Sequence, residues 1–178
     1  MGLVYTQNRQ NMELYQLVYY SRNTIYGDER AYIDGVTGIL TSARKNNKPK
    51  NITGFLLADR SWFFQVLEGD KKSLALILEK IYADKRHTGL TIIQNTKILT
   101  RSFDNWLMGC SLRTPEKYAI YCRHGIGLKF DPRSLDVETI IALAYDLSQH
   151  EQATLALKNS AESSINMEVS STQLQAHQ

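Results

Sequence analysis

Cysteine is scarce in this chain, and so are the marks of a membrane or secreted protein. Its 178 residues include only Cys110 and Cys122, too few and too irregularly spaced for a disulfide framework or a zinc site. No apolar run approaches the ~18–20 residues that a helix needs to cross a bilayer. Residues 1–12 lack the apolar stretch of a signal peptide. We therefore expect a cytoplasmic protein that binds neither a metal ion nor a membrane.

An excess of one charge is also missing. The chain has 21 lysines and arginines against 18 aspartates and glutamates, a net charge of +3. The basic residues are scattered rather than clustered, so a nucleic-acid-binding surface is not predicted. A hydrophobic fraction of 43% and a charged fraction of 22% are ordinary for a globular domain.

Two kinds of periodicity alternate along the first two thirds of the chain. Segments rich in strand-forming residues alternate with segments in which apolar residues recur every three or four positions. The first kind predicts strands and the second kind predicts helices. The expected strands are 14–20, 52–57, 62–67, 90–99 and 106–112, and the first expected helix is 31–47. The second helix is expected to begin after Asp70, to carry its apolar stripe from Leu74 to Tyr82 and to end before Arg86. This order, βαββαββ, predicts an α+β ferredoxin-like sandwich with a five-stranded mixed sheet and two helices on one face.

The remaining chain predicts how the domain is completed. Residues 13–113 form the main domain, and 1–12 are an N-terminal extension. Residues 114–158 include an amphipathic helix from Asp136 to Leu147, which we expect to cap the other sheet face. From 159 to 178 the sequence is rich in Ser, Gln and Ala with few large apolar groups, so a disordered tail is predicted.

One polar residue stands out in an apolar strand. Gln65 lies within Phe63-Phe64-Gln65-Val66-Leu67, where an unpaired buried amide costs on the order of 1–3 kcal/mol. An amide can both donate and accept hydrogen bonds, and rotation exchanges its partners. The predicted fold brings Gln65 near Tyr19 of the first strand and Asn47 at a helix end. These residues form neither a metal ligand set nor a catalytic triad.

The motifs around these residues resemble the BLUF family of flavin-binding blue-light sensors, over roughly Glu13 to Arg113. They are Tyr15-Gln16-Leu17-Val18-Tyr19, Arg44-Lys45-Asn46-Asn47, Ile52-Thr53-Gly54, Phe64-Gln65-Val66-Leu67-Glu68-Gly69, Asp84-Lys85-Arg86-His87 and Phe103-Asp104-Asn105-Trp106-Leu107-Met108. Any one of these motifs alone is weak evidence. Six of them in the same order make a specific match.

The resemblance implies a cofactor and a set of roles. FAD would lie between the two helices, bound non-covalently by Tyr19, Ile39, Asn46, Asn47, Gln65, Arg86, His87 and Met108. Tyr19 would give an electron and a proton to the excited flavin, and Gln65 would rearrange its amide and shift the absorption to the red. Asn47 would hold the pyrimidine edge of the flavin. Arg86 and His87 would lie near its ribityl and phosphate end.

Some of these residues have a second interpretation. Arg86 and His87 also fit a solvated charge cluster at a helix end, and Ile39 fits the ordinary core as well as a cofactor wall. Trp106 and Met108 are two residues apart in an expected strand, so they should share a face. The resemblance makes them a signal relay, whereas simple core packing is the alternative.

We therefore expect a photoreceptor rather than an enzyme. The chain has no room for a cyclase, phosphodiesterase or kinase module, so it should signal to a separate protein, for which a cyclic-di-GMP phosphodiesterase is one candidate, and should form a homo-oligomer. Two rival hypotheses are open. One is an acylphosphatase-like hydrolase in which Arg86 or Arg22 holds phosphate and Asn47 positions water, and the other is a ligand-sensing module without photochemistry.

Overall fold

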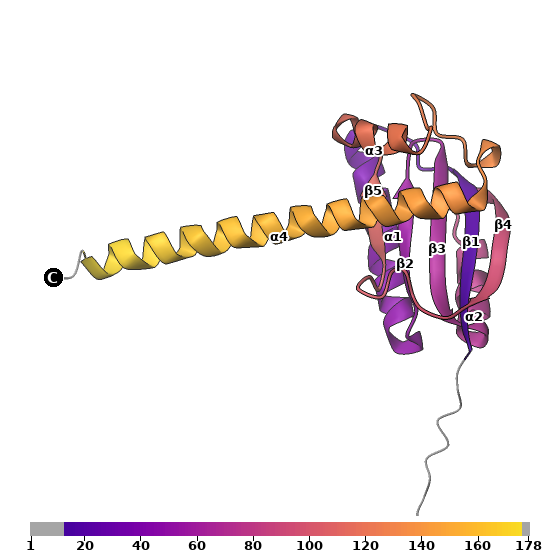
Figure 1. Ribbon diagram of the computed structural model, residues 1–178, viewed down its shortest axis with the longest axis horizontal. Helices are drawn as coiled ribbons and strands as arrows, with labels where there is room; N and C mark the ends of the chain where they lie inside the picture. Colours follow the sequence, from indigo (N-terminus) through magenta and orange to yellow (C-terminus); the bar gives the residue numbers. More distant parts are fainter. Residues whose placement is uncertain (1–12, 176–178) are drawn as a thin grey trace, which may run out of the picture.

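The computed structural model describes residues 13–175, with side chains described as far as residue 160. The predicted N-terminal extension, 1–12, therefore lies outside the described residues. One mixed sheet forms the centre of the molecule (Figure 1). Its strands are β1 (Leu14–Asn23), β2 (Thr53–Ala58), β3 (Trp62–Asp70), β4 (His87–Ile98) and β5 (Gly109–Leu112).

The strand order is β4-β1-β3-β2-β5. All neighbours are antiparallel except β2 and β5, which are parallel. The predicted ferredoxin-like sandwich is thereby confirmed. This order makes β1 and β3 central neighbours, so residues that face the helices from these two strands lie side by side.

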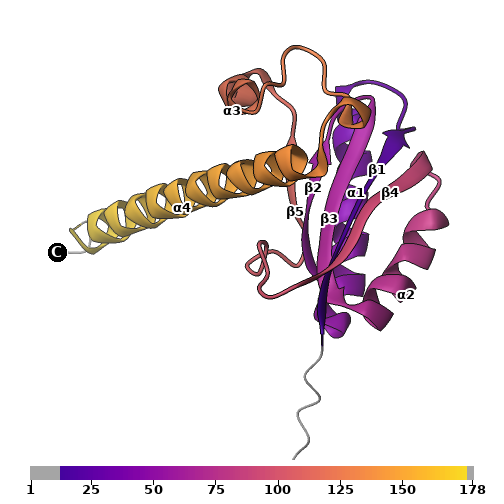
Figure 2. The same ribbon diagram turned by 45° about the vertical axis from the view of Figure 1, so that its right-hand side comes forward.

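Two helices, α1 (Glu29–Asn47) and α2 (Lys71–Tyr82), cover one face of the sheet (Figure 2). Each begins at an aspartate whose side chain accepts a hydrogen bond from a backbone N–H in the first turn: Asp28 from Ala31 and Asp70 from Ser73, both at 2.9 Å. Such caps satisfy N–H groups that have no partner within the helix. The two helices bury their apolar stripes against the inner residues of β1, β2 and β3.

The opposite face is covered by α4 (Val137–Gln175), which crosses the strands as the predicted cap does (Figure 1). Asp136 caps it, accepting a hydrogen bond from Thr139 N at 2.6 Å. Ile140, Leu143 and Leu147 are fully buried in the core on this side. A short helix, α3 (Tyr118–Arg123), precedes α4 at the edge of this layer.

The helical cap is much longer than predicted. The sequence predicted disorder from 159, but α4 continues to Gln175, well past the β5 edge of the sheet (Figure 1). Helix growth adds one hydrogen bond per residue once a nucleus exists, and the packed turns before Ser148 supply such a nucleus. Ala153, Ala156 and Leu157 also favour a helix.

The last strand is shorter than predicted, and this changes where its neighbours point. β5 begins at Gly109 rather than Trp106, because Trp106 N bonds back to Phe103 O at 3.0 Å in a local turn. Met108 is buried on the helix side of the sheet, whereas Trp106 packs on the α4 side. The prediction that they share a face is therefore wrong, since alternation applies only within a strand.

Gly109 explains where β5 can begin. A Cβ at this position would lie 2.5 Å from the Phe55 ring and 2.7 Å from the Trp106 ring. Only glycine lets the backbone pass this close to both rings.

Among the described residues, no helix is long and apolar enough to cross a membrane.

Candidate functional site

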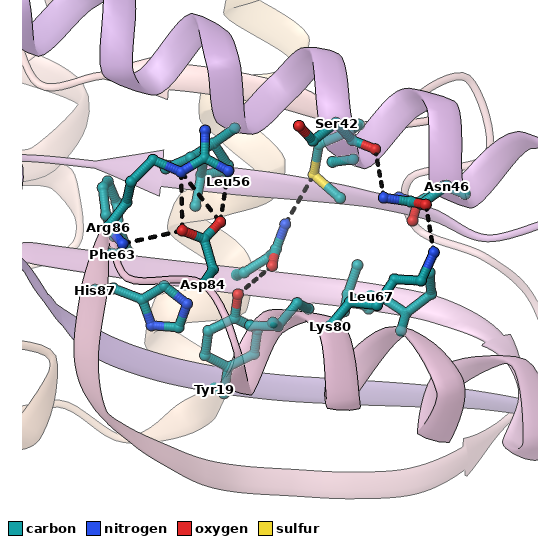
Figure 3. A pocket seen from close by; sticks show the side chains of 17 residues that line it. Tyr19, Ser42, Asn46, Leu56, Phe63, Leu67, Lys80, Asp84, Arg86 and His87 are labelled. Atoms are coloured by element: carbon teal, nitrogen blue, oxygen red, sulfur yellow. Dashed lines mark hydrogen bonds and ion pairs between the residues drawn. The ribbon is translucent and has the colours of Figure 1, made fainter.

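A cleft between α1 and α2, with the sheet as its floor, contains the predicted site residues (Figure 3). It encloses about 620 Å³ free of protein atoms, counting its open mouth. Every residue predicted to bind the cofactor lines it: Tyr19, Ile39, Asn46, Asn47, Gln65, Arg86, His87 and Met108. The sequence motifs therefore converge on one place, although they come from β1, α1, β3, β4, the α2–β4 turn and the segment just before β5.

Tyr19 and Gln65 are directly paired residues of β1 and β3. The Tyr19 hydroxyl donates a short hydrogen bond to Gln65 Oε1, and both side chains are buried. Burial raises the pKa of Tyr19 far above its ordinary value, and the negative charge of Asp84 raises it further. Tyr19 is therefore a neutral phenol with its proton directed at the amide oxygen.

The other end of the Gln65 amide meets a weak partner. Nε2 of Gln65 donates to the thioether sulfur of Met108 at 3.0 Å. Sulfur is a poorer acceptor than an oxygen or an aromatic nitrogen. The amide is thus held strongly by Tyr19 on one side and loosely by Met108 on the other, an arrangement that favours exchange of partners.

Asn47 has an unused hydrogen-bond acceptor. It ends α1 and is buried, and its Nδ2 donates to Leu107 O at 2.8 Å. Its Oδ1 is buried without a hydrogen-bond partner among the described residues. Leaving such an oxygen unpaired costs on the order of 1–3 kcal/mol. A ligand N–H beside a carbonyl, as on the pyrimidine edge of an isoalloxazine, fits this position.

Arg86 and Asp84 form an ion pair at the opposite end of the cleft (Figure 3). The guanidinium grips the carboxylate through Nε–Oδ1 at 2.9 Å and Nη2–Oδ2 at 2.5 Å. Partial burial pushes the pKa of Asp84 up, but the hydrogen bonds and charge of Arg86 outweigh it and hold this pKa below its usual value. Gly38 leaves room for the guanidinium, since a Cβ there would lie 3.0 Å from Arg86 Nη1.

His87 is neutral near pH 7. Burial lowers its pKa, and the nearby Asp84 carboxylate only partly offsets this effect. Its Nδ1 is buried and has no hydrogen-bond partner in the described structure. Like Asn47, His87 lines the cleft and has a buried side-chain atom that can form a further hydrogen bond.

Comparison with known proteins identifies the family. Residues 14–109 match the family model described as sensors of blue-light using FAD. The chain belongs to the BLUF family. Members of this family use FAD as the blue-light-absorbing cofactor, and the unpaired acceptor of Asn47 and the two-ended Gln65 amide fit such a flavin.

The curated relatives contain a similar segment within much longer proteins. This BLUF domain is 31% identical over 96 residues to the photoactivated adenylate cyclase subunit alpha of Euglena gracilis and, equally, to its alpha-like protein FB. The match covers 54% of this chain but 9% of each relative. The chain thus spans about a tenth of the length of these curated relatives.

Two solved BLUF proteins share the fold over most of their length. The photo-activated state of BlsA is 26% identical, with a TM-score of 0.65, over 75% of this chain and 94% of that one. The dark state of BlrB is 25% identical, with a TM-score of 0.62, over 75% and 93%. The share of this chain that each structure covers, 75%, is larger than the segment that the family model matches.

The predicted relay residues of the BLUF domain divide between the two sheet faces. Met108 contacts Gln65 in the cleft, whereas Trp106 lies outside the cleft against Phe55, with ring centroids 5.9 Å apart. The indole Nε1 of Trp106 is buried without a partner among the described residues. Ile39 lines the cleft and also packs against the core, so its role as a cofactor wall stays a prediction.

Sequence reasoning gave no role to Lys80 and Asp84, which also line the BLUF cleft. Lys80 of α2 donates to Asn46 Oδ1 of α1 at 2.6 Å and so links the two helices at the mouth (Figure 3). Its place on the polar side of a helical stripe predicts only solvent exposure. Asp84 belongs to the motif Asp84-Lys85-Arg86-His87, and its position two residues before Arg86 is the feature of the sequence that could have predicted their ion pair.

The version of the hydrolase hypothesis in which Arg22 holds the phosphate fails on geometry. Arg22 lies on the α4 side of the sheet, with its guanidinium 4.1 Å from the centroid of the Trp62 ring. Asn47 opens into the cleft on the other side. Arg86 remains in the cleft but is already paired with Asp84. Within residues 13–160, no group of three His, Cys, Asp or Glu side chains is placed to hold a metal ion.

Proposed function

We propose that this chain is a blue-light photoreceptor whose FAD lies in the α1–α2 cleft and whose signal begins at Gln65. The observation that carries the proposal is the buried hydrogen-bonded chain from Tyr19 through Gln65 to Met108. Every group in it can change partners without unfolding anything. When bound, the flavin supplies blue-light absorption and electron acceptance.

Several residues would hold the cofactor. Asn47 offers an unpaired acceptor beside a fixed donor, which suits a ring edge with alternating N–H and carbonyl groups. The side-chain amide of Gln65 can donate hydrogen bonds to the same flavin ring. Arg86 supplies a cationic donor at the end of the cleft away from Asn46, where it would face the anionic phosphate tail, and Lys80 supplies a second one beside Asn46.

The chemistry on the protein side is the movement of one proton and one amide. Tyr19 keeps its proton at rest, since burial raises its pKa. Once its ring is oxidised, the hydroxyl becomes strongly acidic, and Gln65 Oε1 is the hydrogen-bonded group that can take the proton. Gln65 then rotates or tautomerises, and its bond to the Met108 sulfur is replaced by another partner.

The output would leave through β5. Met108 immediately precedes this strand, and Ser111 within it accepts a hydrogen bond from Lys117 Nζ at 3.0 Å. Lys117 also pairs with Glu151 of α4. A change at Met108 can thus reach α4 along the β5 backbone to Ser111 and then through two direct contacts.

We further propose a sensory rather than catalytic role for this chain. The photoactivated adenylate cyclases among its relatives support a cyclic-nucleotide enzyme as the kind of output. The separate partner, a cyclic-di-GMP phosphodiesterase among the candidates, the homo-oligomer and the cytoplasmic location stay predictions from the sequence.

The absorption spectrum of the purified chain tests this function. We expect the purified chain to show flavin absorption bands in the blue and to release FAD on denaturation. Under blue light these bands should shift slightly to the red, and the shift should reverse in the dark. A colourless protein that takes up neither FAD nor riboflavin would contradict the proposal. A coloured protein without the reversible shift would leave flavin binding but contradict the role in light sensing.

A further inference from the structure

The segment 106–108, which connects the cleft to β5, is held by its carbonyl groups. Each of them accepts a hydrogen bond from a distant donor. The donors are Gly54 N on Trp106 O (2.9 Å), Asn47 Nδ2 on Leu107 O (2.8 Å) and Arg44 Nε on Met108 O (3.0 Å). The segment precedes the first paired residue of β5, so these bonds fix its position where sheet pairing does not.

Arg44 differs from its neighbours in this group. Ala43, Asn46 and Asn47 line the cleft, but Arg44 does not. It lies in the last turn of α1, and its Nε–H crosses to a residue 64 positions along the chain. The residue it holds, Met108, is buried and accepts the hydrogen bond from Gln65 at its sulfur.

Met108 therefore accepts one hydrogen bond at its backbone carbonyl and another at its side-chain sulfur. The Arg44 bond fixes the backbone of Met108, and the Cα position in turn limits where the thioether sulfur can lie. A methionine side chain has three flexible torsions. Without a fixed backbone, the 3.0 Å contact from Gln65 Nε2 to the sulfur is one of many accessible arrangements.

We propose that Arg44 is a positioning residue that holds Met108 at hydrogen-bonding distance from Gln65. The light-dependent part of this inference rests on the proposed function. The competing explanation is that Arg44 is an ordinary cation at a helix C-terminus, where positive charge interacts favourably with the last carbonyls. That role requires the charge, whereas positioning requires a donor at the place of Nε.

Four variants of the full chain separate these explanations. In Arg44→Gln, the amide nitrogen lies as many bonds from Cβ as Arg Nε does, so a donor is kept without the charge. In Arg44→Met, a methyl group takes that place and the donor is lost. Arg44→Lys keeps the charge but moves the donor one bond further out. Lys45→Met removes an exposed charge from the same turn and serves as the control.

Two measurements report on Gln65 directly. The first is the pair of side-chain amide signals of Gln65 in a ¹H–¹⁵N spectrum, assigned by their loss in Gln65→Leu. The second is the rate of dark recovery after blue light. For Arg44→Met we expect shifted amide signals and a recovery about fivefold slower, the effect of one typical hydrogen bond. Arg44→Gln should restore both, and Lys45→Met should change neither.

A double mutant tests the link through sulfur. In a Met108→Leu background the sulfur is gone, so Arg44→Met should cause no further change in recovery. Equal effects in both backgrounds would overturn the proposal. So would the opposite rescue pattern, in which Arg44→Lys behaves like the natural chain and Arg44→Gln like Arg44→Met.

Failure of the two proposals can be told apart. If the natural chain shows no flavin or no red shift, the proposed function fails, and the amide signals of Gln65 alone decide the role of Arg44. If Arg44→Met does not fold, as judged by its melting curve, the comparison of Arg44→Gln with Arg44→Lys decides it. Unchanged amide signals in a folded Arg44→Met would contradict the inference.

Discussion

Lys117 and Glu151 form an ion pair that joins the segment after β5 to α4. The exposed fractions of the two side chains are 12% and 21%, so neither is well solvated. Lys117 Nζ also donates to Leu112 O at 3.2 Å. The pair therefore ties the segment that follows β5 to the helix that covers the sheet, and so joins the proposed signal path to the cap.

Breaking this pair should destabilise the protein. Glu151→Leu leaves the Lys117 charge largely buried without its partner, and we expect a loss of roughly 2 kcal/mol, below the ~3–5 kcal/mol of fully buried pairs. Chemical denaturation followed by circular dichroism measures it. The control is Asp34→Ala, which removes an exposed ion pair with Arg30. The side chain of Arg30 is 91% exposed and that of Asp34 is 73% exposed. Equal losses in both variants would contradict the account.

Stability should depend on the protonation of His87. Its pKa is lower in the folded protein than the ordinary 6.5, so below about pH 6.5 the unfolded chain binds the proton more readily. The free energy of unfolding should therefore fall as the pH falls from 6.5 through the lowered folded pKa. In His87→Asn this part of the pH dependence should disappear. Parallel curves for the two proteins between pH 5 and 7 would show that His87 does not contribute.

Asn47 should matter more for flavin affinity than for folding. Asn47→Ala removes the unpaired Oδ1 and the donor to Leu107 O, and we expect flavin binding to weaken by about tenfold or more. Fluorescence titration with FAD measures the affinity. Lys45→Ala, an exposed residue of the same turn, should bind as the natural chain does. If the two variants bind equally well, Asn47 does not hold the flavin.

Glu68 should hold the β4–β5 connection in place. It is fully buried, and its carboxylate accepts hydrogen bonds from Ser102 N at 2.9 Å, Phe103 N at 3.1 Å and Gln16 Nε2 at 3.0 Å. Glu68→Gln points an N–H₂ group at N–H donors, and we expect a loss of roughly 2–4 kcal/mol with faster proteolysis at 99–107.

Gln16→Leu provides the comparison for Glu68. It removes one of these donors and leaves both backbone N–H groups on the carboxylate, so its loss of stability should be clearly smaller. A Glu68→Gln protein that is as stable as the natural chain would show that these bonds do not secure the connection.

Much of the fold and site could be predicted because the deciding signals are local. The strand and helix periodicities and the polar Gln65 in an apolar strand are both visible in short stretches. Once β1 and β3 are placed side by side, the meeting of Tyr19 and Gln65 follows. The ordered motifs then predict the rest of the cleft.

What could not be predicted depends on contacts between distant segments. The start of β5 is set by the approach of Gly109 to Phe55, and this contact separates Trp106 from Met108. The Arg44 bond to Met108 and the Lys117–Glu151 pair join residues whose spacing carries no periodic signal. The length of α4 follows from its packed first turns rather than from the composition of its end.

The central claim is that the signal begins with a change of partners at Gln65. The most direct measurement is the light-minus-dark absorption spectrum of Gln65→Leu loaded with FAD. Leucine has nearly the same size but can neither accept from Tyr19 nor donate to another group. We predict flavin bands without the reversible red shift, whereas a red shift like that of the natural chain would contradict the account.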